Sequence, residues 1–184
     1  MKRSALNSSF DTFYFQTDFP RANGDRRACW EAVFSPRGLR GLRLLGDDKP
    51  AARVSDSRVK NLQRKIVARM NGKRADIDWN KLDFSGHADF HHRVWKAMQQ
   101  IPFGETATYA EVADAAGSPM AFRACGQACG ANPVILFVPC HRVVASNGLG
   151  GFGCGLDIKK DLLRLEGIDW RQLGKMRREP VLFS

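Results

Sequence analysis

Apolar and polar positions follow one period in the first part of the chain and another in the rest. Over residues 10–45, short apolar runs rich in aromatic residues are separated by polar segments or by turns with Pro and Gly, a pattern typical of β-strands. Strands are predicted over 10–19, 29–34 and 39–45. The segment 35–38, Ser-Pro-Arg-Gly, joins the last two strands into a hairpin. The pattern therefore predicts a small antiparallel sheet.

Beyond residue 55 the apolar residues recur every three or four positions, which is the period of a helix with one buried face. The first such helix is expected to begin near Ser55–Ser57 and to end at Asn71-Gly72. Its basic side chains are assigned to the solvated face: Arg58, Lys60, Arg64, Lys65 and Arg69. Further helices are predicted over 90–100, 109–116, 118–130 and 156–166.

These elements predict an α+β fold with two domains. Residues 1–80 are expected to form a small N-terminal α/β domain with the short antiparallel sheet and one helix, and residues 81–184 a mostly helical C-terminal domain. Within the second domain a short helix closed by Gly117 is followed by Ser118-Pro119, an N-cap and first-turn signal for the next helix. Two short helices joined by a tight turn with Gly are typical of a helix-turn-helix.

The net positive charge of the chain makes nucleic acid a candidate partner. The 184 residues carry a formal net charge of +10, and residues 1–80 hold 17 Lys and Arg against 9 Asp and Glu. A basic protein gains affinity for nucleic acid by releasing counterions, although many basic proteins bind none. No apolar stretch has the length of a membrane span, and the first 30 residues lack the apolar core of a signal peptide. We therefore expect a cytoplasmic protein, associated with the nucleoid if its source is bacterial, that is monomeric and does not contact a membrane.

The candidate chemistry lies in residues 132–144, Asn-Pro-Val-Ile-Leu-Phe-Val-Pro-Cys-His-Arg-Val-Val. An apolar run of strand-like length leads to Cys140 and His141, which stand between Pro139 and Arg142. A neighbouring cation lowers the pKa of a thiol and favours a nucleophilic thiolate, whereas a thiol in an apolar wall stays protonated. Cys140 is therefore a candidate nucleophile, with a buried structural cysteine as the alternative.

A relay is the expected way to activate this thiol. Adjacent residues of an extended chain point in opposite directions, so a direct hydrogen bond between Cys140 and His141 requires a turn of the backbone. Instead, a water held by His141 would take the thiol proton while a carboxylate orients the imidazole. The five cysteines include no C-x-x-C pair and are expected to be free thiols. His91 and His92 point in different directions on a helix, and no metal site is expected.

The residues around Cys140 resemble a known family. The run Pro139-Cys140-His141-Arg142-Val143-Val144, with Asn132 eight positions earlier and Glu166-Gly167 after a short helix, is similar to the active-site signature of O6-alkylguanine-DNA alkyltransferases. Residues 90–104, 105–117, 120–132 and 148–155 match that family's C-terminal domain in order and spacing. The resemblance implies a methylated-DNA–protein-cysteine S-methyltransferase that repairs DNA.

By this resemblance, the alkyl group of O6-alkylguanine passes irreversibly to Cys140, once per molecule and without a cofactor. O4-alkylthymine is a second candidate substrate. Glu166 would orient His141, His141 would act through water on Cys140, Asn132 would brace the backbone, and the Tyr109 phenol would donate to the departing base. The pocket for the base would be completed by the Val143 carbonyl, the Gly153 N–H, the aromatic wall of Phe152, and Cys129.

The resemblance also implies double-stranded DNA as the partner. The base carrying the alkyl group lies within the stack and must be flipped out, and Arg123 corresponds to the arginine that takes its place. Thr108, Ala124 and Gln127 are expected to contact DNA with it. The helix over 118–130 has many small residues and few long polar ones, which favours shape-based docking in the minor groove. Close helix packing in the core is the alternative for these small residues.

Two other functions fit parts of the sequence. A non-catalytic protein that binds alkylated bases shares this scaffold but replaces the cysteine, so Cys140 argues against it. A transcriptional regulator would use the helix-turn-helix, but the chain is too short for an additional sensor domain. Phe152 stands where the family often has tyrosine, and Cys129 where it often has a larger apolar residue. The pocket is therefore expected to be roomier than in other members.

Overall fold

Three antiparallel strands form the predicted sheet. The computed structural model describes residues 10–22, 24, 26–45, 55–174 and 183. The strands β1 (Asp11–Phe19), β2 (Arg26–Ser35) and β3 (Gly38–Leu45) pair in the order β1-β2-β3. Aromatic and aliphatic residues at alternate positions put one face of the sheet in the core, as for Phe15, Phe19 and Trp30. The strand predictions are confirmed, apart from a β2 that begins three residues early.

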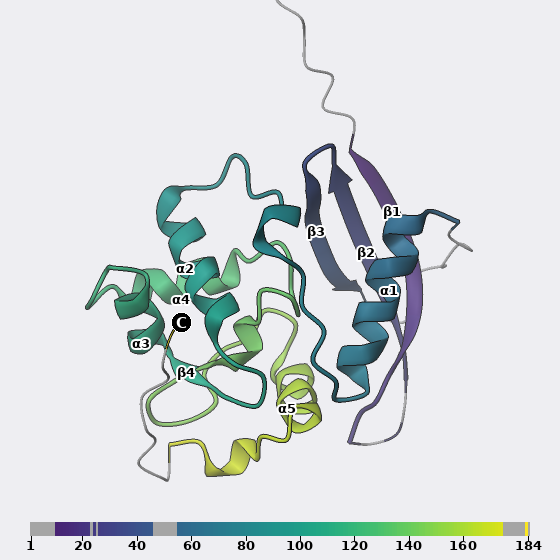
Figure 1. Cartoon of the computed structure of the whole chain (residues 1–184). Helices are drawn as coiled ribbons and strands as arrows, with labels where there is room; N and C mark the ends of the chain where they lie inside the picture. The colour runs from purple at the N-terminus through teal and green to yellow at the C-terminus, as the bar shows by residue number, and fades with distance from the viewer. Residues whose placement is uncertain (1–9, 23, 25, 46–54, 175–182, 184) are drawn as a thin grey trace, which may run out of the picture.

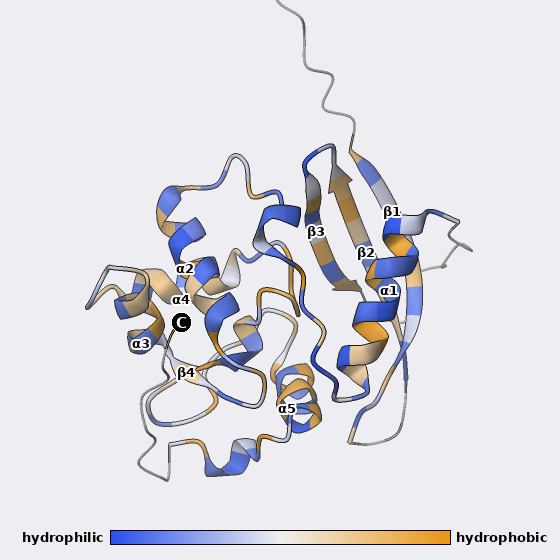
Figure 2. Cartoon of the chain, viewed as in Figure 1, coloured by the Kyte–Doolittle hydropathy of each residue, from blue (hydrophilic) through white to orange (hydrophobic). Residues whose placement is uncertain are grey.

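The helix α1 (Ser57–Met70) packs against β1 and completes the N-terminal half, as Figure 1 shows. The side chain of its N-cap Asp56 accepts a hydrogen bond from the Arg58 N–H at 2.8 Å, and the chain leaves through Gly72 at φ +67°. Bands of apolar and polar residues alternate along α1 in Figure 2, as expected for a helix with one face in the core. The predicted boundaries are thus confirmed.

Arg69 contradicts its assignment to the solvated face of α1. Its residue exposure is 3%, because position 69 follows Leu62 by seven residues and Ile66 by three and therefore lies on the buried face. Lys60, by contrast, is exposed as predicted. One of its partners, Glu166, belongs to the other half of the chain and is described with the site.

The C-terminal half is mostly helical. Its helices are α2 (Asp89–Gln100), α3 (Tyr109–Ala115), α4 (Phe122–Gly130) and α5 (Leu156–Leu165), with short 3-10 turns η1 (Trp79–Lys81), η2 (Cys140–Arg142) and η3 (Trp170–Gln172). A small parallel pair joins β4 (Ala107–Thr108) to β5 (Val143–Val144). Figure 1 places α2, α3 and α4 on the side of the molecule away from the sheet. The α+β class and the helix pair α3–α4 agree with the sequence-based expectation.

One large cluster of buried side chains joins the two halves. It includes Trp30 of β2, Ile66 of α1, Trp95 of α2 and Val138 before Cys140. His87, His91 and His92 are half-buried and pack around Trp95, with ring centroids 4.9 to 6.1 Å away. Among the described residues, no helix is long and apolar enough to cross a membrane.

The start of α4 differs from the prediction. Ser118-Pro119 forms a turn in which the Ala121 N–H donates to the Ser118 carbonyl at 3.1 Å, and the helix begins only at Phe122. Met120 adopts a left-handed φ of +70°, which an α-helix cannot include. The turn thus projects Met120 into solvent with 86% of its surface exposed.

The apolar run 134–138 is not a strand. Val134 bridges to Leu42 at the edge of β3, and the Ile135 N–H donates to the Leu42 carbonyl at 3.2 Å. The chain then winds through turns, with Leu136 at φ +73° and the Val138 N–H bonded to the Val134 carbonyl at 3.0 Å. The run has the apolar content of a strand because it is buried, but its backbone groups find partners in the β3 edge and in its own turns. This segment leads directly to Cys140.

Candidate active site

Cys140 and His141 occupy successive positions of the 3-10 turn η2. The Arg142 N–H donates to the Pro139 carbonyl at 2.9 Å, so the backbone does turn at this point. The two side chains nevertheless enter different surroundings. Cys140 lines a pocket and is 8% exposed, whereas the His141 imidazole is fully buried beside Glu166. A direct Cys–His pair is therefore absent from this part of the described chain, as the sequence reasoning expected.

Asn132 ties the thiol to the loop that delivers it. Its Oδ1 accepts from the Val134 N–H at 3.0 Å, and its Nδ2 donates to the Val138 carbonyl at 2.7 Å. The same Nδ2 donates to Cys140 Sγ at 3.2 Å. The amide thus joins both ends of the apolar run and also supplies the sulfur with a donor, which stabilises a thiolate more than a thiol.

The resting thiol is nonetheless neutral. Burial raises the pKa of Cys140 to about 11, although the Asn132 hydrogen bond and the charge of Lys159 oppose this effect. The expectation that Arg142 places its charge beside the thiol is wrong. The Arg142 guanidinium points away from the sulfur and donates to both oxygens of Glu166, at 2.7 and 2.8 Å, and to the Ile101 carbonyl at 2.7 Å.

Lys159 is the cation that acts on Cys140, and sequence reasoning missed it. Its side chain is buried in α5, where Nζ donates to three backbone carbonyls, those of Val143 and Leu149 at 2.6 Å and of Gly151 at 3.0 Å. Burial lowers the pKa of Lys159 to about 8, which leaves the amine largely charged at neutral pH. The signal was its position, three residues before Leu162 on the buried face of α5.

Glu166 receives three basic side chains at the C-cap of α5. His141 Nε2 and Arg69 Nη1 lie 3.0 and 3.3 Å from its Oε1, and Arg142 bonds both carboxylate oxygens. Burial alone would raise the pKa of Glu166, but the hydrogen bonds and charges of His141 and Arg142 outweigh it and lower the pKa to about 2. The carboxylate is thus ionised throughout the physiological range.

This arrangement fixes the protonation of His141. An ionised carboxylate can only accept, so Nε2 of His141 carries the proton and Nδ1 keeps its lone pair. Burial lowers the pKa of His141 despite the bond to Glu166, so the imidazole is neutral at pH 7. Nδ1 is buried and has no hydrogen-bond partner among the described residues. A buried acceptor of this kind suits a general base that works through a bridging water.

The pocket in front of Cys140 gathers most of the predicted base-binding residues. It has a volume of about 150 Å³ and is lined by Tyr109, Gly126, Cys129, Gly130, Cys140, Gly151, Phe152 and Gly153. The Tyr109 hydroxyl donates to the Gly151 carbonyl at 3.5 Å. A side chain at position 150 would be strained, since φ is +70° and an added Cβ would lie 3.0 Å from the Ala145 nitrogen and 3.1 Å from the Tyr109 ring. Val143 does not line this pocket, and its carbonyl accepts from Lys159.

The predicted DNA-contacting residues lie on and beside α4. Arg123 and Gln127 are exposed, Ala124 is half-buried, and the Arg123 guanidinium lies 5.8 Å from the ring centre of Phe122. Thr108 caps α3, where its hydroxyl and the Glu111 side chain form a reciprocal capping box.

The opposite face of α4 is packed into the protein. Cys125 and Ala128 are buried there, and Trp95 Nε1 donates to the Ala128 carbonyl at 2.8 Å. The small residues of α4 thus allow close packing on one face, while the other face is exposed to solvent. Neither of the two interpretations drawn from the sequence excludes the other.

The cysteines and acidic residues form no metal centre within the described ranges, where no group of three or more His, Cys, Asp or Glu is close enough to hold an ion. All five cysteines are outside disulfides, as predicted from their spacing.

Comparison with known proteins agrees with this geometry. Residues 89–168 match the family model described as "6-O-methylguanine DNA methyltransferase, DNA binding domain". A methylated-DNA–protein-cysteine methyltransferase of Methanosarcina barkeri is 42% identical over 136 residues, which cover 71% of this chain and 85% of that protein. The methylated-DNA–protein-cysteine methyltransferase of Mycolicibacterium paratuberculosis is 52% identical over 87 residues, which cover 47% of this chain and 52% of that protein.

Solved structures extend the similarity to the N-terminal half. Mycobacterium tuberculosis OGT in complex with DNA matches with a TM-score of 0.66 and 37% identity, covering 83% of this chain and 91% of that one. The O6-methylguanine-DNA methyltransferase of Pyrococcus kodakaraensis matches with a TM-score of 0.63 and 25% identity, covering 84% and 99%. With its fold, its buried Cys-His-Glu set and these relatives, the chain belongs to the methylated-DNA–protein-cysteine methyltransferase family.

Proposed function

We propose that this protein repairs O6-alkylguanine in duplex DNA by moving the alkyl group onto its own Cys140. The observation that carries the proposal is the chain of contacts behind the thiol: Asn132 donates to the sulfur, while Glu166 fixes His141 with Nδ1 free to accept a proton. The sulfur stands at the wall of a pocket whose other walls are Tyr109 and glycine-rich backbone. A planar base fits such walls because glycine backbone lies close to its faces.

The transfer balances with these side chains and a bridging water. The Cys140 thiol gives its proton through a water to His141 Nδ1, and the resulting imidazolium is stabilised by the ionised Glu166. The sulfur then attacks the alkyl carbon, so that a carbon–sulfur bond forms while the carbon–oxygen bond to guanine breaks. The base takes a proton from the Tyr109 phenol, whose pKa is raised by burial so that it stays protonated at pH 7. Solvent returns the proton to Tyr109 from His141.

The product explains a single turnover. A thioether has no easily displaced group, so the alkyl group stays on Cys140. Each molecule would therefore act once, without a cofactor.

Access to the lesion requires the nucleotide to leave the duplex. Extruding a base costs roughly a few kcal/mol, and a side chain that fills the gap offsets part of this cost. Arg123 is exposed on α4, next to the exposed apolar residues Met120 and Phe122. Minor-groove proteins use apolar and Arg side chains together at kinked steps. We place the minor groove against this end of α4. The M. tuberculosis relative solved with DNA supports DNA binding by this fold.

The decisive experiment uses a duplex with one O6-methylguanine and measures the intact protein mass. We expect a gain of one methyl group per molecule in the wild type and none in Cys140→Ser or with unmodified duplex. A gain retained in Cys140→Ser would contradict the proposal. Binding to the lesion without any mass gain would favour the non-catalytic alternative. The monomeric state and the cytoplasmic location stay predictions, and light scattering with and without DNA tests the first.

A further inference from the structure

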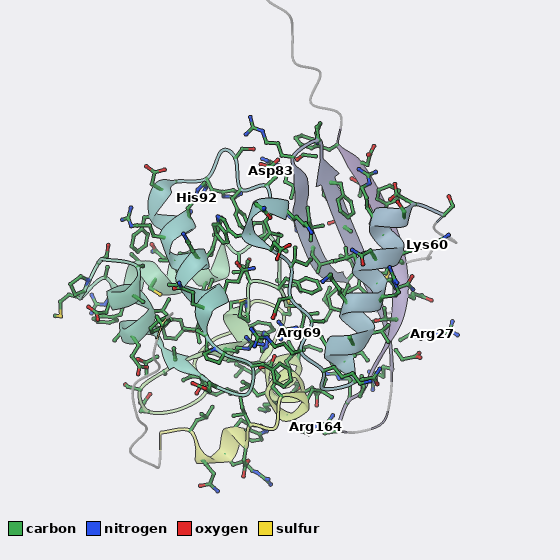
Figure 3. The ribbon with its side chains drawn as sticks, in the orientation of Figure 1. Arg27, Lys60, Arg69, Asp83, His92 and Arg164 are labelled. Carbon is green, nitrogen blue, oxygen red and sulfur yellow. The ribbon has the colours of Figure 1, made fainter. Side chains whose placement is uncertain are left out.

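Arg69 connects the N-terminal helix to the active site. It lies in the last turn of α1, and Figure 3 shows it extending toward the centre of the molecule, whereas Lys60 lies on the outer side of the same helix. Its Nε donates to the Ala75 carbonyl at 2.9 Å and its Nη2 to Asp76 Oδ1 at 2.6 Å. Nη1 donates to Glu166 Oε1 at 3.3 Å, although Glu166 lies 97 positions later in the sequence. The guanidinium is thus held on one side and aimed at the carboxylate on the other.

The oxygen that Arg69 contacts is the one that orients His141. Glu166 Oε1 also accepts from His141 Nε2 at 3.0 Å and from Arg142 Nη2 at 2.8 Å. Three donors from two segments, α1 and η2, therefore converge on one atom, and the loss of any one leaves the carboxylate freer to rotate. Arg69 and Arg142 also share the ring of Phe103, each 5.6 Å from its centre.

Burying the Arg69 guanidinium has an electrostatic cost that packing alone does not explain. A buried guanidinium loses its hydration, and here a second guanidinium, that of Arg142, lies close enough to repel it. Both effects lower the pKa of Arg69, burial first, and Asp76 and Glu166 offset them. A hydrophobic residue at position 69 would avoid both costs, so the charge itself calls for an explanation.

We propose that Arg69 is a positioning residue for alkyl transfer, which holds the Glu166 carboxylate against His141 and so sets the proton acceptor for Cys140. The inference rests on the proposed function. It gives the N-terminal half a part in the chemistry, because α1 supplies one of the two arginines that fix the carboxylate. The charged groups that face His141 in the described structure are Glu166 from the end of α5, Arg142 from η2 and Arg69 from α1.

The pH dependence follows from these charges. Transfer needs the neutral imidazole, so the rate falls as the pH drops through the pKa of His141 in the complex. The positive charge of Arg69 lowers that pKa. Removing the charge raises the pKa, and the acid limb of the rate profile moves to higher pH. A residue that only tied the two halves together would change stability and leave the limb in place.

The test compares Arg69→Met with Arg69→Lys and with Arg64→Met, an exposed arginine on the same helix. The readout is the single-turnover rate with free O6-benzylguanine from pH 5 to 9, which avoids any effect on DNA binding, together with thermal unfolding. We expect Arg69→Met to slow transfer about tenfold or more at pH 6, as small displacements of a catalytic group do, and to move the acid limb upward. Arg69→Lys should keep the limb near its wild-type pH, and Arg64→Met should change nothing.

An unchanged acid limb in a folded Arg69→Met would overturn the proposal. If that variant does not fold, the decision passes to Arg69→Lys and to the His141 imidazole titration by NMR in Asp76→Asn, which removes the outer anchor of Arg69. A His141 pKa that is the same in Asp76→Asn and the wild type would also overturn it. Failure of the proposed function is separate, since the wild type would then gain no methyl group on Cys140 while the His141 titration would still respond to Arg69.

Discussion

The hydrogen bond from Asn132 to Cys140 yields a quantitative prediction for Asn132→Ala. A hydrogen bond to a charged group contributes about 1.5–3 kcal/mol, and 1.36 kcal/mol corresponds to one pKa unit. Loss of the 3.2 Å contact from Nδ2 to Sγ should therefore raise the pKa of Cys140 from about 11 by about one to two units. At pH 9 the thiolate fraction falls by the same factor, about tenfold to a hundredfold.

The assay is carbamidomethylation of Cys140 by iodoacetamide from pH 8 to 11, followed by mass of the Cys140 peptide. The variant also leaves the Val134 N–H without its acceptor. The Val138 carbonyl loses the Asn132 amide but still accepts from the Cys140 N–H at 2.8 Å. Some loss of stability, about 1–3 kcal/mol, is thus expected and is measured separately. Asn61→Ala, at an exposed asparagine, is the control. A folded Asn132→Ala with the wild-type pH profile would refute the role of this hydrogen bond.

Three further predictions concern the DNA face and the buried charges. Arg123→Ala should slow repair in duplex DNA far more than reaction with free O6-benzylguanine, because only the duplex requires flipping, and equal losses would count against this role. The pKa of Lys159 is about 8 in the fold against 10.5 when free, so the unfolded chain holds more protons between these values and stability should rise by about 1 kcal/mol from pH 8 to 9. Lys159→Met should lose that rise in urea titrations at the two pH values. Glu166→Gln leaves Arg69 and Arg142 facing a neutral amide and should lower stability by about 3–5 kcal/mol, seen as a lower Tm, whereas the exposed Glu105→Gln should not.

The sequence was informative where a local pattern determines the structure. Alternation and helical periodicity located the strands and helices within a few residues, because pleated strands and helices each bury a face at a fixed spacing. The resemblance to the alkyltransferase signature implied a set of Asn132, Cys140, His141 and Glu166, and the structure links Asn132 to Cys140 and His141 to Glu166. Spacing could not predict that the run before Cys140 winds instead of extending, since that depends on the free edge of β3 at Leu42.

Buried charges were the main error. Arg69 and Lys159 were overlooked because a basic residue on a helix is usually solvated. Each lies on the buried face of its helix, and a close look at that stripe would have identified both as candidates. Their partners, however, are a carboxylate 97 residues away for Arg69 and three loop carbonyls for Lys159. No local pattern contains those contacts, and for the same reason the sequence assigned the cation near the thiol to Arg142.

The most direct test of the mechanism is the ionisation of Cys140 in the resting protein. Thiolate absorbance near 240 nm, taken as the difference between wild type and Cys140→Ser, isolates this thiol from the other four and from the tyrosines. We expect no difference at pH 7 and a rise with a midpoint near 11, because burial outweighs Asn132 and Lys159 and the proton leaves only through His141 when the base is bound. A full difference signal already present at pH 7 would mean a preformed thiolate and would contradict the relay.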